Sequence, residues 1–135
     1  MPGYRRVNLV LEQNPDLHAL VTQALGAEWG ERKVVDAYLI RWEPGAVTPY
    51  HDHGEAEGVI VVLAGRVFEE HYCKKTKEQF GQRDVGWRGK TFTEGPRLIQ
   101  RMGNAGDVPA LSLHLFFNGP MTMTEYTEEE MRVGQ

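Results

Sequence analysis

The sequence predicts an all-β domain, a sandwich or barrel of short strands that follows one short helix. After Trp29 the apolar pattern changes to a period of two, and it recurs in about seven or eight short segments. The turns between these segments are rich in Gly and Pro, which is typical of antiparallel β architecture. The chain of 135 residues is long enough for one domain with a buried core.

The helix is expected near the N-terminus. Asn14 can cap it, Pro15 suits its first turn and Gly26 can end it. Apolar residues that recur at helical spacing predict one buried face, formed by Leu17, Leu20, Val21, Ala24 and Leu25.

Strand segments are expected along the rest of the chain, at residues 33–42, 46–53, 58–65, 66–73, 97–102 and 110–117. The stretch 74–96 is interpreted as a loop with room for one strand. In the last segment Leu113 and Leu115 fall on one face, and Ser112 and His114 on the other. We therefore expect a single domain over residues 1–135, with a helical extension (1–30), a barrel (31–125) and a C-terminal tail (126–135).

Composition excludes several classes of function. The net charge is -4 and the Lys and Arg residues are scattered, so a nucleic-acid partner is not expected. The single cysteine, Cys73, excludes an internal disulfide and a multi-cysteine zinc site. The N-terminus lacks the apolar core of a signal peptide, and no segment has the length of a membrane span. We expect a cytoplasmic protein without a membrane partner.

Two histidines one residue apart follow a Pro-Gly turn. His51 and His53 fall at i and i+2 of an expected strand, so their side chains point to the same side. Paired imidazoles of this kind suit Fe, Cu, Ni, Zn or Mn. The spacing alone leaves open a pair of surface histidines beside a turn.

The residues around this pair strengthen the metal hypothesis. Gly45, His51, His53 and Gly65 have a spacing that resembles the first cupin motif. The segment RLIQRMGN, with Gln100 at the histidine position, resembles the second cupin motif. The resemblance extends over roughly residues 35–125 and implies a cupin double-stranded β-helix, a jelly-roll barrel that can enclose a ligand cavity.

Within the cupins, the chain is similar to the thiol dioxygenases, the family of cysteine dioxygenase and the bacterial 3-mercaptopropionate dioxygenases. Three features carry this resemblance: the segment WEPGAVTPYHDHG, the segment PALSLHLFFNGPMTMTEY, and Gly58 in place of a ligand glutamate. The resemblance implies one Fe(II) ion held by three histidines, two of them being His51 and His53. It also implies a Ser–His–Tyr relay that begins with Ser112 and His114.

Two positions depart from this family pattern. The third ligand position is Gln100, so the expected metal ligands His51, His53 and Gln100 are all neutral. We expect weaker metal binding, altered redox behaviour, or both; the alternative is that Gln100 only forms hydrogen bonds within the cavity. The tyrosine position of the relay is Phe116, which removes a hydroxyl group.

No arginine stands out as the partner of a substrate carboxylate. Residues 4–10 resemble the arginine-bearing segment of the mammalian enzymes, but they are expected to lie far from His51 unless the helix is an insertion. Arg32, Arg41 and Arg97 are the other candidates.

Other acidic and metal-binding side chains are weaker candidates. Glu57 becomes a fourth ligand only if the strand register shifts by one, so we expect it to point outward. Asp52 alternates away from the histidines. His71 and Cys73 share a strand face and could form a second metal pair, although a small buried cysteine beside a polar neighbour is the commoner explanation.

The leading hypothesis is a mononuclear metal-binding cupin that uses Fe(II) and O2 to oxidise a small thiol-like substrate, with His114 and Ser112 as catalytic residues. Zn, Ni, Mn or no metal are the alternatives to Fe(II). The second hypothesis is a cupin that has lost thiol oxidation and either binds a small molecule or catalyses a metal-assisted isomerase, cyclase or lyase step. The resemblance is also compatible with a homodimer.

Overall fold

The computed structural model describes residues 3–9, 13–29, 34–96, 98–117 and 122–132. Its elements, in chain order, are β1 (Tyr4–Asn8), α1 (Pro15–Trp29), β2 (Asp36–Trp42), β3 (Tyr50–Asp52), β4 (Gly58–Ala64), β5 (Val67–Cys73), β6 (Asp84–Gly86), β7 (Thr91–Glu94), β8 (Leu98–Asn104), β9 (Ala110–Phe116) and β10 (Thr124–Tyr126). The helix in these ranges lacks the length and apolar character that a membrane span requires.

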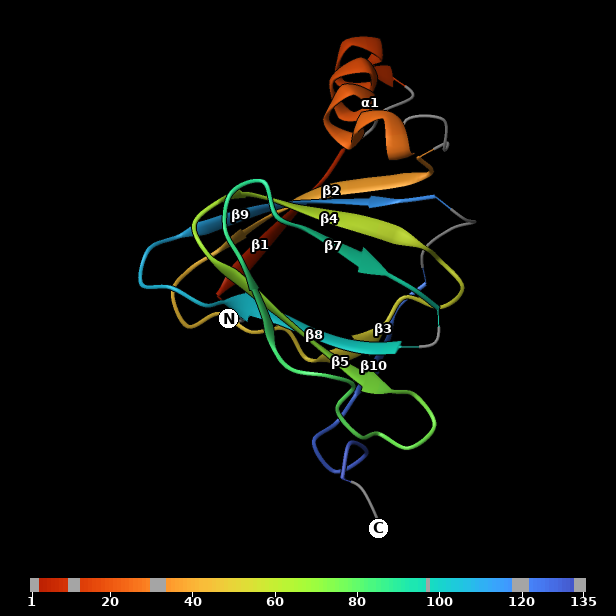
Figure 1. Ribbon diagram of the computed structural model, residues 1–135, viewed down its shortest axis with the longest axis vertical. Coiled ribbons are helices and arrows are strands. Elements are labelled where there is room, and N and C mark those ends of the chain that lie inside the picture. The colour runs from red at the N-terminus through yellow and green to blue at the C-terminus, as the bar shows by residue number, and fades with distance from the viewer. Residues whose placement is uncertain (1–2, 10–12, 30–33, 97, 118–121, 133–135) are drawn as a thin grey trace.

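Two antiparallel sheets face each other across the interior (Figure 1). The first has the strand order β1-β2-β9-β4-β7, and the second has the order β10-β3-β8-β5-β6. Most neighbouring strands are distant in sequence; β2, for example, pairs with β9 and places Tyr38 opposite His114. This topology confirms the predicted all-β jelly-roll barrel with one helix.

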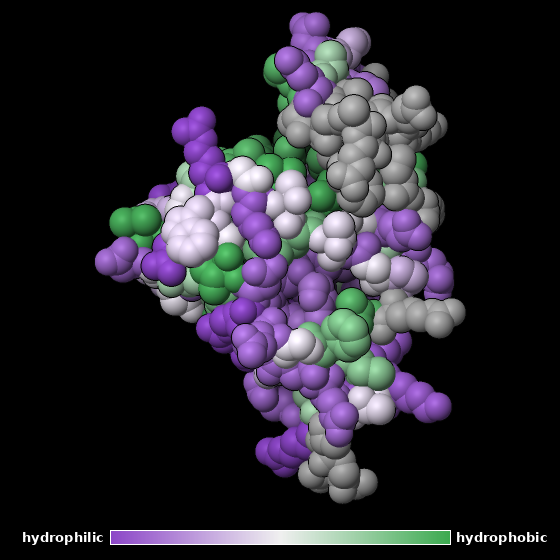
Figure 2. All heavy atoms as spheres, in the orientation of Figure 1, coloured by the Kyte–Doolittle hydropathy of each residue, from purple (hydrophilic) through white to green (hydrophobic). Residues whose placement is uncertain are grey.

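Apolar side chains form two cores because the central strands of the first sheet are buried on both faces. One core lies between the sheets and contains Trp42 and Phe116. The other lies on the outer face of the first sheet, where Val21 of α1 belongs to the same cluster as Leu115. Figure 2 shows hydrophobic side chains gathered over the upper sheet beside the helix, while most of the lower part of this face is hydrophilic.

The helix begins as predicted, but its buried side is narrower. The amide of Leu17 donates a hydrogen bond to Asn14 Oδ1 at 3.1 Å, which is the contact of an N-cap. Leu20, predicted on the buried face, is 63% exposed. Among the predicted apolar positions whose side chains are described, burial is therefore concentrated at Leu17 and Val21.

The N-terminal segment is more than the predicted helical extension. Residues Tyr4–Asn8 form β1, which pairs with β2 at the edge of the first sheet and places Arg6 opposite Ile40. Alternating side chains of β1 can therefore reach the barrel interior, a placement that the prediction for residues 1–30 missed.

Two further strands differ from the predictions. The stretch 74–96 contains both β6 and β7 instead of at most one strand. Strand β10 pairs with β3, with Glu125 opposite His51 and Tyr126 opposite Tyr50, so the second sheet continues past the predicted barrel limit at residue 125. Both ends of the chain thus contribute strands around the same interior.

Candidate metal centre

A cavity of about 330 Å³ lies between the two sheets. Its walls bring together four of the predicted site residues and both chain ends, with the lining residues Tyr4, Arg6, Tyr38, Ile40, Trp42, Thr48, Pro49, His51, His53, Gln100, Met102, His114, Met123 and Glu125. This volume suits a small molecule. We call this space the histidine cavity, after His51, His53 and His114.

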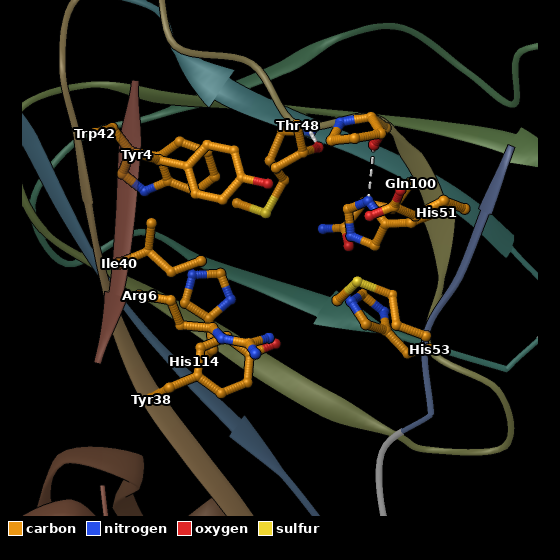
Figure 3. Close-up of a pocket in the computed structure, with 14 residues that line it drawn as sticks. Tyr4, Arg6, Tyr38, Ile40, Trp42, Thr48, His51, His53, Gln100 and His114 are labelled. Atoms are coloured by element: carbon orange, nitrogen blue, oxygen red, sulfur yellow. Dashed lines mark hydrogen bonds between the residues drawn. The ribbon is translucent and has the colours of Figure 1, made fainter. Parts of the chain in front are cut away.

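His51 and His53 face this cavity from the same side, as their strand spacing predicted (Figure 3). Their ring centroids are 4.9 Å apart, and the rings are nearly perpendicular at 82°. His51 Nδ1 lies 2.8 Å from the carbonyl oxygen of Pro49. Because a carbonyl only accepts, Nδ1 carries the hydrogen and Nε2 is left with a free lone pair.

Burial keeps both imidazoles neutral, which is the form that binds metal. Burial lowers the pKa of His51, against the opposing effect of the hydrogen bond to Pro49. Burial, together with the neighbouring His51, lowers the pKa of His53 to about 3.

Gln100 comes from β8, directly opposite His51 in the neighbouring strand. Its amide nitrogen donates hydrogen bonds to Glu69 and Glu94, so the orientation of the amide is set by two carboxylates. Its Oε1 is buried and has no hydrogen-bond partner among the residues that the structure describes. Leaving a buried acceptor unpaired is unfavourable, and a bound cation would satisfy this oxygen. The two neutral imidazoles and this oxygen fit a divalent metal.

The predicted Ser112–His114 pair is formed and extends to Trp42. Ser112 Oγ lies 2.7 Å from His114 Nε2, and the indole of Trp42 donates to the same Oγ at 2.9 Å. Because the serine oxygen accepts from the indole, its own hydrogen is available to His114 Nε2, and a bond in that direction corresponds to the Nδ1–H tautomer of His114. Burial lowers the pKa of His114 to about 3, so the imidazole is neutral.

Gly58 leaves no room for the glutamate that ordinary cupins place there. A Cβ atom at this position would lie 2.5 Å from the carbonyl oxygen of Leu115 and 2.6 Å from the Phe116 ring. The Phe116 ring, 5.0 Å from that of His53, occupies this side of the site. Gly58 and Phe116 therefore depend on each other, because the Phe116 ring fills the space that a side chain at position 58 would need.

The structure places an arginine in the cavity that the sequence left undecided. Arg6 of β1 lines the cavity and lies over the Tyr38 ring, 5.1 Å from its centroid. No ion pair joins Arg6 to a carboxylate among the described residues. Of the other candidates, Arg41 is exposed and pairs with Glu43, whereas positions 32 and 97 lie outside the described residues. The resemblance of residues 4–10 to the arginine-bearing segment of the mammalian enzymes was the available signal.

The two acids weighed in the sequence near the histidine pair, Asp52 and Glu57, do not line the cavity. Asp52 points away from it and accepts hydrogen bonds from the Tyr126 hydroxyl at 2.5 Å and from the Gly54 amide at 3.0 Å. Although burial opposes them, these bonds lower the pKa of Asp52. Glu57 is absent from the lining residues, in agreement with its predicted outward direction.

His71 meets two glutamates instead of Cys73. Its Nε2 lies 2.9 Å from Glu69 Oε1 and 3.5 Å from Glu94 Oε2. We call Glu69, His71 and Glu94 the glutamate cluster. Burial and the adjacent Glu69 raise the pKa of Glu94 well above its ordinary value. The alternation of VFEEH placed Glu69 and His71 on one face, but it gave no sign that Glu94 would join them.

Comparisons with known proteins agree with this geometry. The chain matches the model of the family named cysteine dioxygenase type I over residues 24–129. No curated protein matches it. An oxalate oxidase structure has 18% identity and a TM-score of 0.67, and the match covers 92% of this chain and 55% of that chain. The Lactobacillus farciminis oxalate decarboxylase has 13% identity and a TM-score of 0.66, and the match covers 93% of this chain and 32% of that chain.

These solved structures are distant relatives, so they show the fold alone. This chain spans little more than half of the oxalate oxidase and about a third of the oxalate decarboxylase, at 55% and 32%. The family match is different in kind, because residues 24–129 make up more than half of the chain. With the jelly-roll barrel and the histidine cavity already in place, this match shows that the protein belongs to the cysteine dioxygenase type I family of metal-binding cupins.

Proposed function

We propose that this protein uses one Fe(II) ion and O2 to oxidise a small thiol that carries a carboxylate. The balanced reaction is RSH + O2 → RSO2H, in which sulfur is oxidised and both oxygen atoms are transferred to it. The observation that carries the proposal is the arrangement of one cavity: His51 and His53 lie on one side and Arg6 on the other (Figure 3). A small substrate can therefore reach a metal and an anion partner at the same time.

His51, His53 and Gln100 would hold the metal through two imidazole nitrogens and the unpaired amide oxygen. A bound iron would supply the redox chemistry that the reaction of O2 with a thiol requires. All three ligands are neutral, so the ion would keep its full charge and favour a thiolate over a thiol. An amide oxygen is a weaker donor than a third imidazole, so we expect lower iron affinity than a three-histidine site gives.

Arg6 would hold the substrate carboxylate, since its planar guanidinium can bind both oxygens at once. With the Ser112 hydroxyl donating to Nε2, His114 would present Nδ1–H as its remaining donor. Stacking on Tyr38, with ring centroids 5.0 Å apart and planes 13° apart, fixes this imidazole further. We assign His114 the role of donating a hydrogen bond inside the cavity, and Ser112 and Trp42 the role of positioning it.

The second candidate function is a metal-assisted isomerase, cyclase or lyase step, or small-molecule binding alone. Gln100 and Phe116 favour it, because both replace groups that the thiol dioxygenases use. The Bacillus subtilis oxalate decarboxylase, a fold relative at 18% identity and a TM-score of 0.57, has Mn(II) centres. We therefore keep Mn(II) as the alternative metal for the histidine cavity.

The test is anaerobic loading of the metal-free protein with Fe(II), followed by O2 uptake with cysteine or with 3-mercaptopropionate. We expect one Fe(II) per histidine cavity and one O2 consumed per sulfinic acid formed. His53→Ala is the control and should abolish both. Gln100→His should raise iron affinity and turnover. An iron-loaded protein that consumes no O2 with either thiol would contradict the proposal and favour the second candidate.

A further inference from the structure

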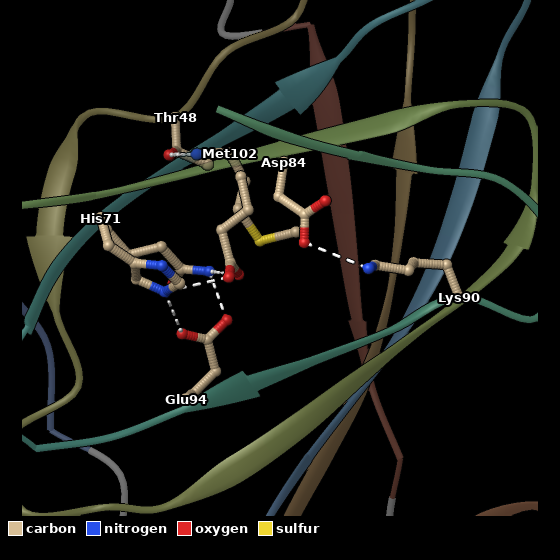
Figure 4. A network of polar contacts seen from close by, with 8 residues as sticks. Thr48, His71, Asp84, Lys90, Glu94 and Met102 are labelled. Carbon is tan, nitrogen blue, oxygen red and sulfur yellow. Dashed lines mark hydrogen bonds and ion pairs between the residues drawn. The ribbon is translucent and has the colours of Figure 1, made fainter. Parts of the chain in front are cut away.

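The glutamate cluster lies on the far side of Gln100 from the histidine pair. Glu69 and His71 stand two residues apart on β5 of the second sheet, and Glu94 comes from β7 of the first sheet. Figure 4 shows His71 and Glu94 turned toward each other between these sheets. Both glutamate side chains are only 2% exposed, whereas the His71 side chain is 22% exposed. The cluster is thus buried, with His71 on its solvent side.

The donor atoms of this cluster have the spacing of a metal coordination shell. One ligand atom from each of the three residues lies within 4.8 Å of the others. His71 Nε2 is 2.9 Å from a Glu69 oxygen and 3.5 Å from a Glu94 oxygen. Two atoms that are each about 2.1 Å from one metal lie about 3.0–3.5 Å apart at angles from 90° to tetrahedral.

An unpartnered nitrogen is an independent sign of a missing ligand. His71 Nε2 is a buried atom and has no hydrogen-bond partner in the part of the chain that the structure describes. The nitrogen lies near both oxygens but forms a hydrogen bond with neither. This geometry is unfavourable for an imidazole beside carboxylates, and it suits an imidazole that shares a cation with them.

Strand β5 also provides an internal comparison for a buried carboxylate. Glu70, on the opposite face of β5, pairs with Arg83 at 3.0 Å and with Arg101 at 2.6 Å. Glu69 and Glu94 have no Lys or Arg partner among the described residues. Buried charges in proteins are generally paired or bound to a metal. A divalent cation would balance two carboxylates completely.

We propose that Glu69, His71 and Glu94 form a second divalent-cation site, separate from the histidine cavity. One imidazole and two carboxylates make a mixed nitrogen and oxygen shell that suits Mn2+, Fe2+, Co2+ or Zn2+. The partly exposed His71 gives the ion a route of entry. The inference does not depend on thiol oxidation in the histidine cavity.

The test counts Mn2+ bound per chain. Protein stripped with a chelator is titrated with MnCl2, and the EPR signal of free Mn2+ gives the number of bound ions. We expect two Mn2+ ions for the unaltered chain and one for the double variant His51→Ala/His53→Ala. Adding His71→Ala to that double variant should weaken the remaining site by at least about 100-fold, beyond the loss of an outer-shell partner.

Two further variants keep the result specific. Glu94→Gln preserves the shape of the side chain and should also weaken the site, while Cys73→Ser, two residues from His71 on the same strand face, should leave it unchanged. The inference is overturned if the double variant binds no Mn2+, or if its Mn2+ survives both His71→Ala and Glu94→Gln. The proposed function fails separately, if removing His51 and His53 does not change the count and no iron-dependent O2 uptake is found.

Discussion

Gln100 lies between two polar regions, the histidine cavity and the glutamate cluster. Both contain histidine, but they differ in charge and in open volume. The histidine cavity contains neutral imidazoles around an open volume, and Arg6 is the cationic side chain among its described lining residues. The glutamate cluster is packed and acidic, and none of the described arginines pairs with it. The amide nitrogen of Gln100 donates to the glutamate cluster, and its oxygen is left available to the histidine cavity. The comparison shows how one residue can match two opposite electrostatic environments.

Replacing Gln100 should therefore disturb both regions at once. We expect Gln100→Leu to lower the free energy of unfolding by roughly 2–5 kcal/mol, because two buried carboxyl groups lose their donor. Iron binding in the histidine cavity should weaken as well. Urea unfolding of the metal-free protein and Fe(II) titration measure the two effects. Met102→Leu, at the next inward position of β8, is the control and should change stability by less than about 1.5 kcal/mol. A stable Gln100→Leu variant would mean that the glutamate cluster does not need this amide.

A variant of Arg6 tests the histidine cavity without affecting the glutamate cluster. Arg6→Gln should raise the KM for 3-mercaptopropionate about 10- to 100-fold, since hydrogen bonds to charged groups contribute roughly 1.5–3 kcal/mol. The stability and the glutamate cluster should be unaffected. Arg5→Gln is the matched control, because Arg5 is the neighbouring arginine on β1 and, unlike Arg6, does not line the cavity. Steady-state O2 uptake measures both variants. Equal KM values for the two variants would remove Arg6 from substrate binding.

The residues found from the sequence and those missed differ in what positions them. Strand alternation put His51 with His53, and Ser112 with His114, on one side of a strand, and the cupin resemblance predicted that these sides face inward. Arg6 depends on a long-range pairing, because β1 returns to the edge of the first sheet beside β2. No local pattern contains that information.

The glutamate cluster was out of reach of the sequence for a related reason. Glu94 belongs to a stretch interpreted as a loop, and it meets Glu69 only because β5 and β7 lie in opposite sheets. The orientation of Gln100 depends in turn on these two carboxylates, one of them 31 residues away. The identity of the third ligand position was visible in the sequence, but the direction of its oxygen was not.

The glutamate cluster should make the metal-free protein less stable as pH rises, because of Glu94. Glu94 has an ordinary pKa of 4.5 and a raised pKa in the folded protein. It therefore keeps its proton after the unfolded chain has lost it. This contribution to stability is complete below about pH 4.5 and is lost as pH rises through the folded pKa, at up to about 1.4 kcal/mol per pH unit.

We expect Glu94→Gln to remove this decline, as measured by urea unfolding of the metal-free protein between pH 4.5 and pH 8. Glu70→Gln is the opposite control: although burial opposes them, hydrogen bonds from Arg101 and Arg83 lower the pKa of Glu70. Its contribution is present above the ordinary pKa and is lost as pH falls, so this variant should be destabilised at neutral pH. The same pH profile for Glu94→Gln and the unaltered chain would mean that the cluster is not strained by its charge.

The smallest effect is expected at the mouth of the histidine cavity, where Glu125 provides a negative charge. Glu125 and Arg6 both line the cavity, so an amino group and a carboxylate of one substrate can each find an opposite charge. Glu125→Gln should raise the KM for cysteine about 3-fold and leave that for 3-mercaptopropionate unchanged, because exposed ion pairs contribute roughly 0.2–1 kcal/mol. The difference should shrink as salt is added. Equal changes in KM for both thiols would show that Glu125 acts on the metal or the fold instead of on the amino group. The cavity would then select its substrate through Arg6 and its volume.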